Sequence, residues 1–233
     1  MQDWMQPPSP ERVPTNCPPG LEHLAVMPEI FIHQKISWVE ICCDWEANQQ
    51  YEILHPETNK RLYKVVEDTS CCTRAWCAES RPLEMSILDY TEKEVLHISR
   101  PFHCASGTGC PPCMDEMVIS TPDGKLLGSV KQQFAWLIPR HHVLDASGDV
   151  VFRIEGPCWY CRCCSEVPFK IYARGESQEV GIIAKRWTGT AKECCTDVDN
   201  FRIAFPNNLD VRLKALLLGA CFSIDLLFFE NRG

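Results

Sequence analysis

Residues 209–229 read LDVRLKALLLGACFSIDLLFF, and this stretch decides which kind of fold the chain can adopt. It is the one long segment without turn residues or a strict alternation of apolar and polar residues, which is typical of an α-helix. Asn207 or Asn208 can cap its start, and Asp210 suits the first helical turn. Residues 215–224 are apolar on every side, so the helix must lie in a membrane or deep inside protein.

The length of the apolar run distinguishes between these two positions. A membrane-spanning helix needs about 20 predominantly apolar residues, whereas the uninterrupted run here covers residues 215–224 and stops at a carboxylate, Asp225. A carboxylate within the hydrocarbon is costly. We therefore favour a buried helix enclosed by a barrel and keep a membrane helix as the alternative. The residues concerned in both cases are Leu213, Leu216, Leu217, Cys221, Ile224 and Asp225.

From about residue 30 the chain consists of short runs with alternating apolar residues, separated by turns. Residues 122–124, Pro-Asp-Gly, are a strong turn signal of this kind. Evenly spaced runs indicate an antiparallel sandwich or barrel, and the weaker runs bring the total to about a dozen strands. The predicted fold is therefore mainly β, with strand runs at 51–54, 61–67, 85–88, 95–99, 118–120, 126–131, 150–155, 169–173 and 180–184.

Residues 1–20 differ from the rest, because they hold six of the 17 prolines and almost no periodicity. This composition is typical of an extended, disordered segment. We divide the chain into this short proline-rich segment, 1–20, and one folded domain, 21–233. Pro7 and Pro10 have the spacing of a ligand for an SH3 or WW module, although a plain linker is the simpler interpretation.

The charge balance limits the partners that the protein can have. The formal net charge is −8 and the pI is about 5.4. Such a balance argues against broad nucleic-acid binding, and against attachment to an anionic membrane by bulk charge alone.

Sixteen cysteines are the unusual feature of the composition. No basic stretch followed by an apolar run opens the chain, so nothing suggests export, and a disulfide framework is not expected in the cytosol. Cys104, Cys110 and Cys113 belong to a segment rich in Gly and Pro, which we expect to be exposed. For this segment we rank S-acylation first, metal binding second and inert thiols third.

Two Cys-x-x-Cys pairs, at 110–113 and 158–161, could together form a four-thiolate zinc site. The gap between them spans several strands, whereas zinc ribbons use tighter spacing, so zinc is less favoured. Cys221 in the apolar helix is interpreted as a small buried hydrophobe. A thiol cluster is left open between packing, metal and lipid; it comprises Cys158, Cys161, Cys163 and Cys164.

The common catalytic patterns are missing from the sequence. There is no Gly-rich phosphate loop, no Gly-x-Ser-x-Gly elbow and no His-Glu-x-x-His. His141 and His142 stand together, and the simplest interpretation is a pair of surface histidines.

Asp197 and Asp199 occupy the first and third positions of a possible twelve-residue calcium loop. The rest of the pattern fails, since position five is Phe201, position six is an arginine and position twelve is Asn208 instead of Glu. Residues 201–205 also alternate like a strand. From spacing alone an ordinary acidic turn is the simpler interpretation, and any calcium site should be weak.

Residues 197–230 as a whole closely resemble the C-terminal signature of the phospholipid scramblases. The signature comprises DVDNFRIAFPNNLDVRLKA followed by LGACFSIDLLFFE. Further matching stretches, at 17–24, 100–104, 156–161 and 185–189, occur in the order that the family has. The resemblance therefore covers nearly the whole chain.

The resemblance implies a tubby-like fold, a closed barrel of about twelve strands around a C-terminal apolar helix. It implies a lipid translocator without covalent catalysis, which moves phospholipids between leaflets in both directions, with calcium and without ATP. The protein would lie at the cytoplasmic face of the plasma membrane and partly in the nucleus.

The resemblance also assigns roles to individual positions. A nuclear import signal, which would need an importin, falls around Lys185, Arg186 and Trp187. Palmitoylated cysteines would be Cys104, Cys110 and Cys113. The calcium-binding residues would be Asp197, Asp199, Phe201, Ile203, Phe205 and Asn208.

The chain departs from the family pattern in three ways. Asn208 replaces an acidic residue, which should weaken calcium binding. The dense cysteine run of the family is diluted to Cys104, Cys110 and Cys113, and the shortened N-terminus leaves little room for partner motifs.

Two other functions stay open. One is a non-transporting, membrane-associated lipid-binding module with a nuclear role, which would bind anionic headgroups through a basic patch at 185–186 and 212–214. The other is an adaptor stabilised by zinc. If the helix is sealed inside the barrel, calcium would have to act by oligomerising the protein or by driving it into the membrane surface.

Overall fold

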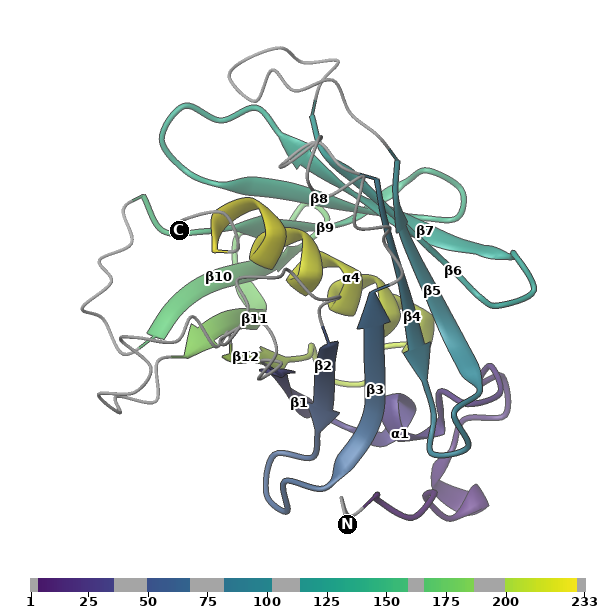
Figure 1. Ribbon diagram of the computed structural model, residues 1–233. Helices are drawn as coiled ribbons and strands as arrows, with labels where there is room; N and C mark the ends of the chain where they lie inside the picture. The colour runs from purple at the N-terminus through teal and green to yellow at the C-terminus, as the bar shows by residue number, and fades with distance from the viewer. Residues whose placement is uncertain are drawn as a thin grey trace, which may run out of the picture.

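The computed structural model describes residues 4–35, 50–67, 82–101, 114–158, 166–186 and 200–229. Within these ranges the chain forms a closed barrel of twelve antiparallel strands with a long helix, α4, along its interior (Figure 1). The mainly β fold with an enclosed C-terminal helix is therefore confirmed.

The strands follow one another around the barrel in chain order, and β12 pairs with β1 to close it. Closure leaves no sheet edge unpaired, so each inward face can serve one common core. The strands are β1 (Glu29–Lys35), β2 (Gln50–Leu54), β3 (Arg61–Glu67), β4 (Leu83–Leu88), β5 (Glu94–Arg100), β6 (Glu116–Ser120), β7 (Leu126–Gln133), β8 (Arg140–Asp145), β9 (Val150–Glu155), β10 (Glu166–Ala173), β11 (Glu179–Arg186) and β12 (Asn200–Ala204).

The barrel has two distinct ends, because successive strands run in opposite directions. Every even-numbered strand finishes at the end where α4 begins, which we call the entry end. Every odd-numbered strand finishes at the other end, where α4 terminates, which we call the exit end. The tight turns 55–60, 89–93, 121–125 and 146–149 therefore lie at the entry end, and the loop 134–139 lies at the exit end.

The side chains of α4 (Val211–Phe228) form the centre of the core. Leu216 and Leu217 are fully buried, as predicted for an all-round apolar helix. The N-cap is Asp210, whose carboxylate accepts a hydrogen bond of 2.8 Å from the backbone N–H of Arg212. The prediction of a cap at Asn207 or Asn208 was wrong. Over the described residues, no helix combines the length and hydropathy needed to cross a bilayer.

Two glycines let the barrel wall approach the helix closely. A Cβ at Gly219 would lie 2.7 Å from Cγ1 of Ile119 on β6. At Gly128 on β7, where φ is +157°, a Cβ would lie 2.1 Å from the carbonyl oxygen of Leu144 and 2.9 Å from Cδ1 of Leu216. Larger residues at these positions would force the wall away from the helix, because a packed interior has little room to yield.

Two buried charged groups of α4 bind partners from the wall and from the N-terminal region. The hydroxyl of Tyr51 donates to the carboxylate of Asp225 over 2.8 Å. The Lys214 ammonium donates to the carbonyl oxygens of Leu24, Ala25 and Met27, at 3.1, 2.9 and 2.6 Å. These carbonyls lie at the C-terminal part of the short helix α1 (Glu22–Val26), so Lys214 attaches α1 to the start of α4.

Residues 4–20, for which the sequence predicts disorder, lie at the entry end of the barrel (Figure 1). The short 3₁₀ helix η1 (Pro10–Arg12) lies in this segment. The backbone N–H of Met5 donates to the carbonyl of Arg61 over 2.9 Å, and the Arg61 guanidinium lies 4.7 Å from the ring centroid of Trp4.

His141 lies inside the barrel, so the prediction of two surface histidines was wrong for this residue. It is fully buried on β8, where alternate residues such as His141 and Val143 point inward. Its ring packs edge-on against Phe228 near the end of α4, with centroids 5.9 Å apart. Within the described part of the chain neither ring nitrogen has a hydrogen-bond partner. Burial lowers the pKa of His141 to about 4.

Leu217→Lys should unfold the barrel, because it places an unpaired ammonium in the centre of the core. We expect a loss of roughly 3–5 kcal/mol in the free energy of unfolding, measured by urea denaturation followed by circular dichroism. Leu126→Lys is the matched control, since Leu126 is 44% exposed and should tolerate the charge. Equal stability of the two variants would contradict a core position for α4.

Lys214→Met should destabilise the protein by roughly 2–4 kcal/mol, because two buried carbonyl groups and one partly buried carbonyl group lose their donor while the apolar stem is kept. The measurement is again denaturant unfolding. Lys170→Met is the control, since Lys170 makes an exposed ion pair with Glu179 at 3.4 Å and should change stability by less than about 1 kcal/mol.

His141→Phe should remove an acid sensitivity of the fold. The pKa of His141 in the folded state, about 4, lies below the ordinary histidine value of 6.5, so the unfolded state takes up the proton first as the pH falls. The wild type should therefore lose about 3 kcal/mol between pH 6.5 and pH 4 through this group. The free energy of unfolding is measured as a function of pH for the wild type and for His141→Phe. The difference between the two proteins should change by that amount between pH 6.5 and pH 4.

His97 serves as a comparison, because its contribution to stability depends on pH in the opposite direction. Although partial burial acts to lower it, hydrogen bonds to Glu94 and Glu84, both at 2.8 Å, raise the pKa of His97 overall. Its contribution to the stability of the folded state is present below pH 6.5 and is lost as the pH rises through the raised pKa.

If the stability of the wild type and that of His141→Phe change in parallel with pH, the acid sensitivity does not come from His141.

Candidate functional site

The described part of the predicted calcium loop is a strand of the barrel. Phe201 and Ile203 on β12 are buried side chains, and β12 pairs with β1 on one side and β11 on the other. Asn208 is exposed in the following turn, with a left-handed φ of 54°. Phe205 is buried, and its backbone N–H donates to the carbonyl of Pro28. The carboxylates on which the prediction depends, Asp197 and Asp199, lie outside the described residues.

The start of β12 is nevertheless well anchored. The Asn200 side-chain oxygen pairs with Nδ1 of His33 on β1. The centroid of the Phe201 ring lies 5.7 Å from that of Phe229, which follows α4. A movement at the start of β12 would therefore reach both the neighbouring strand and the end of the central helix.

The predicted cysteine sites lie mostly outside the described residues. Cys158 is exposed and forms no disulfide, and Cys221 is buried in α4. In the described ranges, no three His, Cys, Asp or Glu side chains are grouped so that they could hold one metal ion. The predicted positions outside the described residues are Cys104, Cys110, Cys113, Cys161, Cys163, Cys164 and Trp187.

A buried ion pair joins the strands on either side of segment 102–113. Nε of Arg100, at the end of β5, lies 2.5 Å from the Asp115 carboxylate, just before β6, and both side chains are buried. The backbone carbonyl of Asp115 also accepts from the N–H of Gln132 on β7, at 2.8 Å. The two attachment points of the predicted acylation segment are therefore held together at the exit end.

The basic patch predicted from sequence does not form as expected. Lys185 and Lys214 are 3% and 5% exposed, so neither can meet a headgroup at the surface. The Lys185 ammonium lies 4.1 Å from the ring centroid of Phe229. Arg186 and Arg212 are exposed. The spacing of basic residues could not show that a strand and a helix would turn the two lysines inward.

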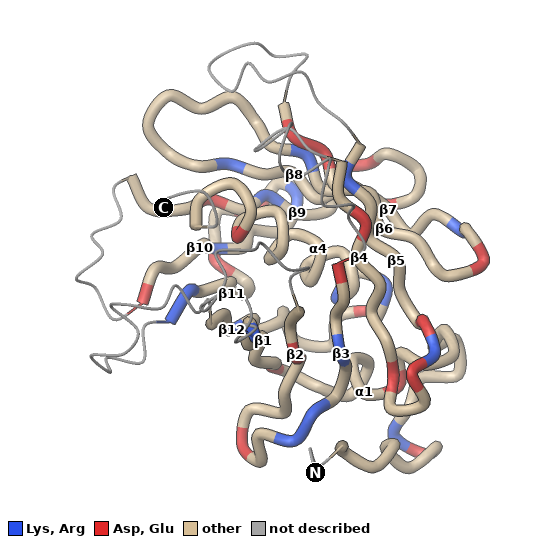
Figure 2. Tube along the Cα trace, viewed as in Figure 1, with Lys and Arg blue, Asp and Glu red and all other residues tan. Residues whose placement is uncertain are grey.

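A different basic group lies at the exit end. The guanidinium groups of Arg140 and Arg153 both contact the Glu155 carboxylate, at 3.0 and 3.2 Å, so two cations share one anion. His142 lies beside them; burial first, and then the charges of Arg153 and Arg140, lower its pKa. Over the rest of the described trace, blue and red segments are interspersed in this view (Figure 2).

The entry end carries a pocket of about 630 Å³, within the range of small-molecule sites. Residues 16–20 and the turns 89–95 and 121–127 supply most of its lining. Its charged lining residues are Lys93, Lys125, Arg212, Asp89, Glu94 and Asp123.

Most of the carboxylates of this pocket accept hydrogen bonds from neighbouring residues of the protein. Although partial burial acts to raise it, hydrogen bonds from Thr91 and Lys93 lower the pKa of Asp89. Glu94 accepts from Ser86 and contacts His97. Sequence reasoning missed the pocket because it is assembled from turns that match no binding motif.

The comparisons with known proteins agree over almost the whole chain. The family model described as Scramblase matches residues 7–231. Phospholipid scramblase 1 of Homo sapiens is 43% identical over 230 residues, covering 99% of this chain and 71% of the relative. Phospholipid scramblase 2 of Bos taurus is 44% identical over 233 residues, covering 99% and 77%.

A more distant relative, phospholipid scramblase family member 5 of Homo sapiens, is 34% identical over 216 residues, covering 93% of this chain and 79% of the relative. No solved structure matches the chain. Because the family model spans both the barrel and its helix, the chain belongs to the phospholipid scramblase family.

Proposed function

We propose that this protein moves phospholipids in both directions between the leaflets of a membrane, in response to calcium and without ATP. The observation that carries the proposal is the match of the Scramblase model to residues 7–231. Membership of the family implies interaction with membrane phospholipids and suggests a lipid translocator more than a catalytic enzyme.

The burial of α4 limits how such a protein could work. A polar headgroup must pass a hydrocarbon layer about 30 Å thick. Leu216 and Leu217 are fully enclosed by the barrel, so α4 can offer a lipid path only if the barrel opens. We therefore propose that the folded protein acts from the membrane surface, by disturbing lipid packing or by assembling with further copies when calcium binds.

Calcium would bind at Asp197 and Asp199, with Asn208 as a weak further ligand. Few carboxylates are available, so the affinity should be low. The anchoring of Asn200 to His33 and of Phe201 to Phe229 supports a mechanical role for this site, since a bound ion would act on the start of β12.

Lipid chains on Cys104, Cys110 and Cys113 would attach the protein to the cytoplasmic leaflet of the plasma membrane. Two or more acyl chains give stable attachment, which a net charge of −8 does not provide. The buried pair of Arg100 and Asp115 supports this proposal, because it fixes the attachment points of the segment at one end of the barrel.

The enclosed helix favours a second candidate function, a membrane-associated module that binds lipids without transporting them. Such a module could also act in the nucleus if an importin recognised residues 185–187. The burial of Lys185 argues against recognition of the intact fold by an importin, since a carrier could reach the Lys185 side chain only after a local opening of β11.

A vesicle assay distinguishes the two functions. The wild type, reconstituted in liposomes with lipid labelled in one leaflet, should lose label asymmetry when calcium is added. Asp197→Asn with Asp199→Asn should reduce the calcium-dependent rate by about tenfold or more, because both charged ligands are removed.

Glu57→Gln with Glu176→Gln is the matched control, since it removes the same charge from exposed positions at the entry end and should leave the rate unchanged. Binding of the wild type to the liposomes without any loss of asymmetry would favour the non-transporting module. An unchanged calcium response in the aspartate variant would contradict the proposed calcium site.

A further inference from the structure

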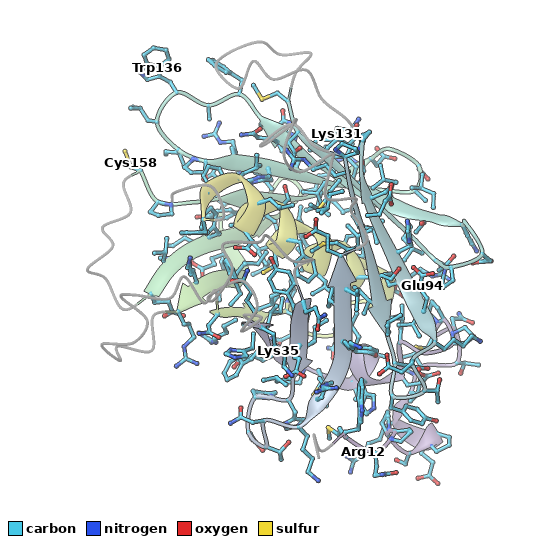
Figure 3. All side chains as sticks on the ribbon, in the orientation of Figure 1. Arg12, Lys35, Glu94, Lys131, Trp136 and Cys158 are labelled. Carbon is cyan, nitrogen blue, oxygen red and sulfur yellow. The ribbon has the colours of Figure 1, made fainter. Side chains whose placement is uncertain are left out.

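The loop 134–139, which joins β7 to β8, exposes three large apolar side chains. Phe134 is 56% exposed, Trp136 is 86% exposed and Leu137 is 62% exposed. Among the described residues, the other exposed large hydrophobic side chains are Tyr90 and Leu126, both at the entry end. Trp136 points away from the barrel at the exit end, on the side where Cys158 also lies, and far from Glu94 (Figure 3).

Such a cluster is costly for a protein surrounded only by water. Each of these side chains would gain by leaving water, and grouped exposed apolar residues mark interaction sites. Tryptophan in particular combines a large apolar ring with a polar N–H, and this suits the boundary between lipid headgroups and acyl chains.

Positive charge stands directly beside the loop. Arg140 follows it at the start of β8, and Arg153 lies on the paired strand β9. The two guanidinium groups share the Glu155 carboxylate, which leaves one positive charge in excess. The side chains of Arg140 and Arg153 are 41% and 39% exposed, so they can reach phosphate groups outside the protein. This local charge opposes the net charge of −8 and fits an anionic membrane surface.

The loop has a firm base. Gln133 and Arg140 are paired across β7 and β8, and the N–H of Gly156 donates to the carbonyl of Pro139 over 2.9 Å. On the other side, the N–H of Gln132 donates to the carbonyl of Asp115. The apolar tip is therefore presented by fixed strands, so less conformational freedom is lost on binding than for a free chain.

We propose that loop 134–139 is a membrane-contact loop. Phe134, Trp136 and Leu137 enter the interfacial layer of a bilayer that contains anionic phospholipid, while Arg140 and Arg153 contact its phosphates. The proposal rests on the membrane association of the proposed function, but it requires neither calcium nor transport.

This contact would orient the whole protein. The exit end would face the bilayer, with the end of α4 and the exposed Cys158 close to the lipid surface. The fixed base of segment 102–113 lies at the same end, through Arg100 and Asp115. The pocket at the entry end would face away from that membrane.

The test is a sedimentation assay with vesicles of phosphatidylcholine, with and without phosphatidylserine, and calcium-free protein made in bacteria. The triple variant Phe134→Ser, Trp136→Ser, Leu137→Ser should bind the mixed vesicles about tenfold more weakly or worse. Tyr90→Ser with Leu126→Ser, which removes exposed apolar groups from the entry end, should bind like the wild type. Arg140→Gln with Arg153→Gln should reduce the preference for phosphatidylserine.

A spectroscopic measurement locates the contact. Brominated phospholipid should quench tryptophan emission of the bound wild type, and Trp136→Phe should lose a large part of this quenching while it still binds. Circular dichroism and a thermal melt show that each loop variant is folded.

The proposal is overturned if the wild type does not bind mixed vesicles, if the triple variant binds them as the wild type does, or if Trp136→Phe keeps all the quenching. Lipid transport is measured separately on the same proteins. If the wild type binds vesicles through the loop but does not transport lipid, the proposed function is wrong and the membrane-contact loop stands. If the wild type transports lipid and the triple variant binds vesicles as the wild type does, the membrane-contact loop is wrong and the proposed function stands.

Discussion

The burial of α4 within the barrel is the constraint on which the rest of the structure depends. A helix that is apolar on all sides has no face to turn toward water, so the strands must surround it. Gly128 and Gly219 allow the wall to approach it, and two charged groups of the helix are bound to protein partners: Lys214 to carbonyls at α1, and Asp225 to Tyr51. The closed barrel and the helix therefore share one hydrophobic core.

This enclosure moves function to the two ends of the barrel. With its interior filled, the molecule can meet other molecules only at its outer surface and its loops, and the two ends differ in character. The entry end holds a pocket of about 630 Å³ whose lining includes charged residues of both signs. The exit end carries the apolar loop 134–139 beside Arg140 and Arg153. An attachment through the exit end would leave the pocket accessible from the aqueous side.

Much of the fold could be predicted because the pattern of a strand or a helix is local. The alternation in 61–67 or 150–155 and the unbroken apolar run in 215–224 reflect which side chains face the core. Other features depended on distant contacts. His141 looked like half of a surface pair, since adjacent histidines give no sign that one of them lies beneath Phe228. The basic patch failed for the same reason, because Lys185 and Lys214 are turned inward by elements whose orientation is set by packing.

The sequence by itself determined the barrel class, the enclosed helix and the family, because periodicity, turn residues and long motifs can be read along the chain. Only the tertiary structure decided which groups meet. It paired Arg100 with Asp115 and set two arginines against Glu155. It also assembled the entry-end pocket from turns far apart in sequence and left Trp136 in water. Which side chains are buried, and which of them touch, depends on how strands that are distant in the sequence pack together. Local sequence patterns do not show this packing.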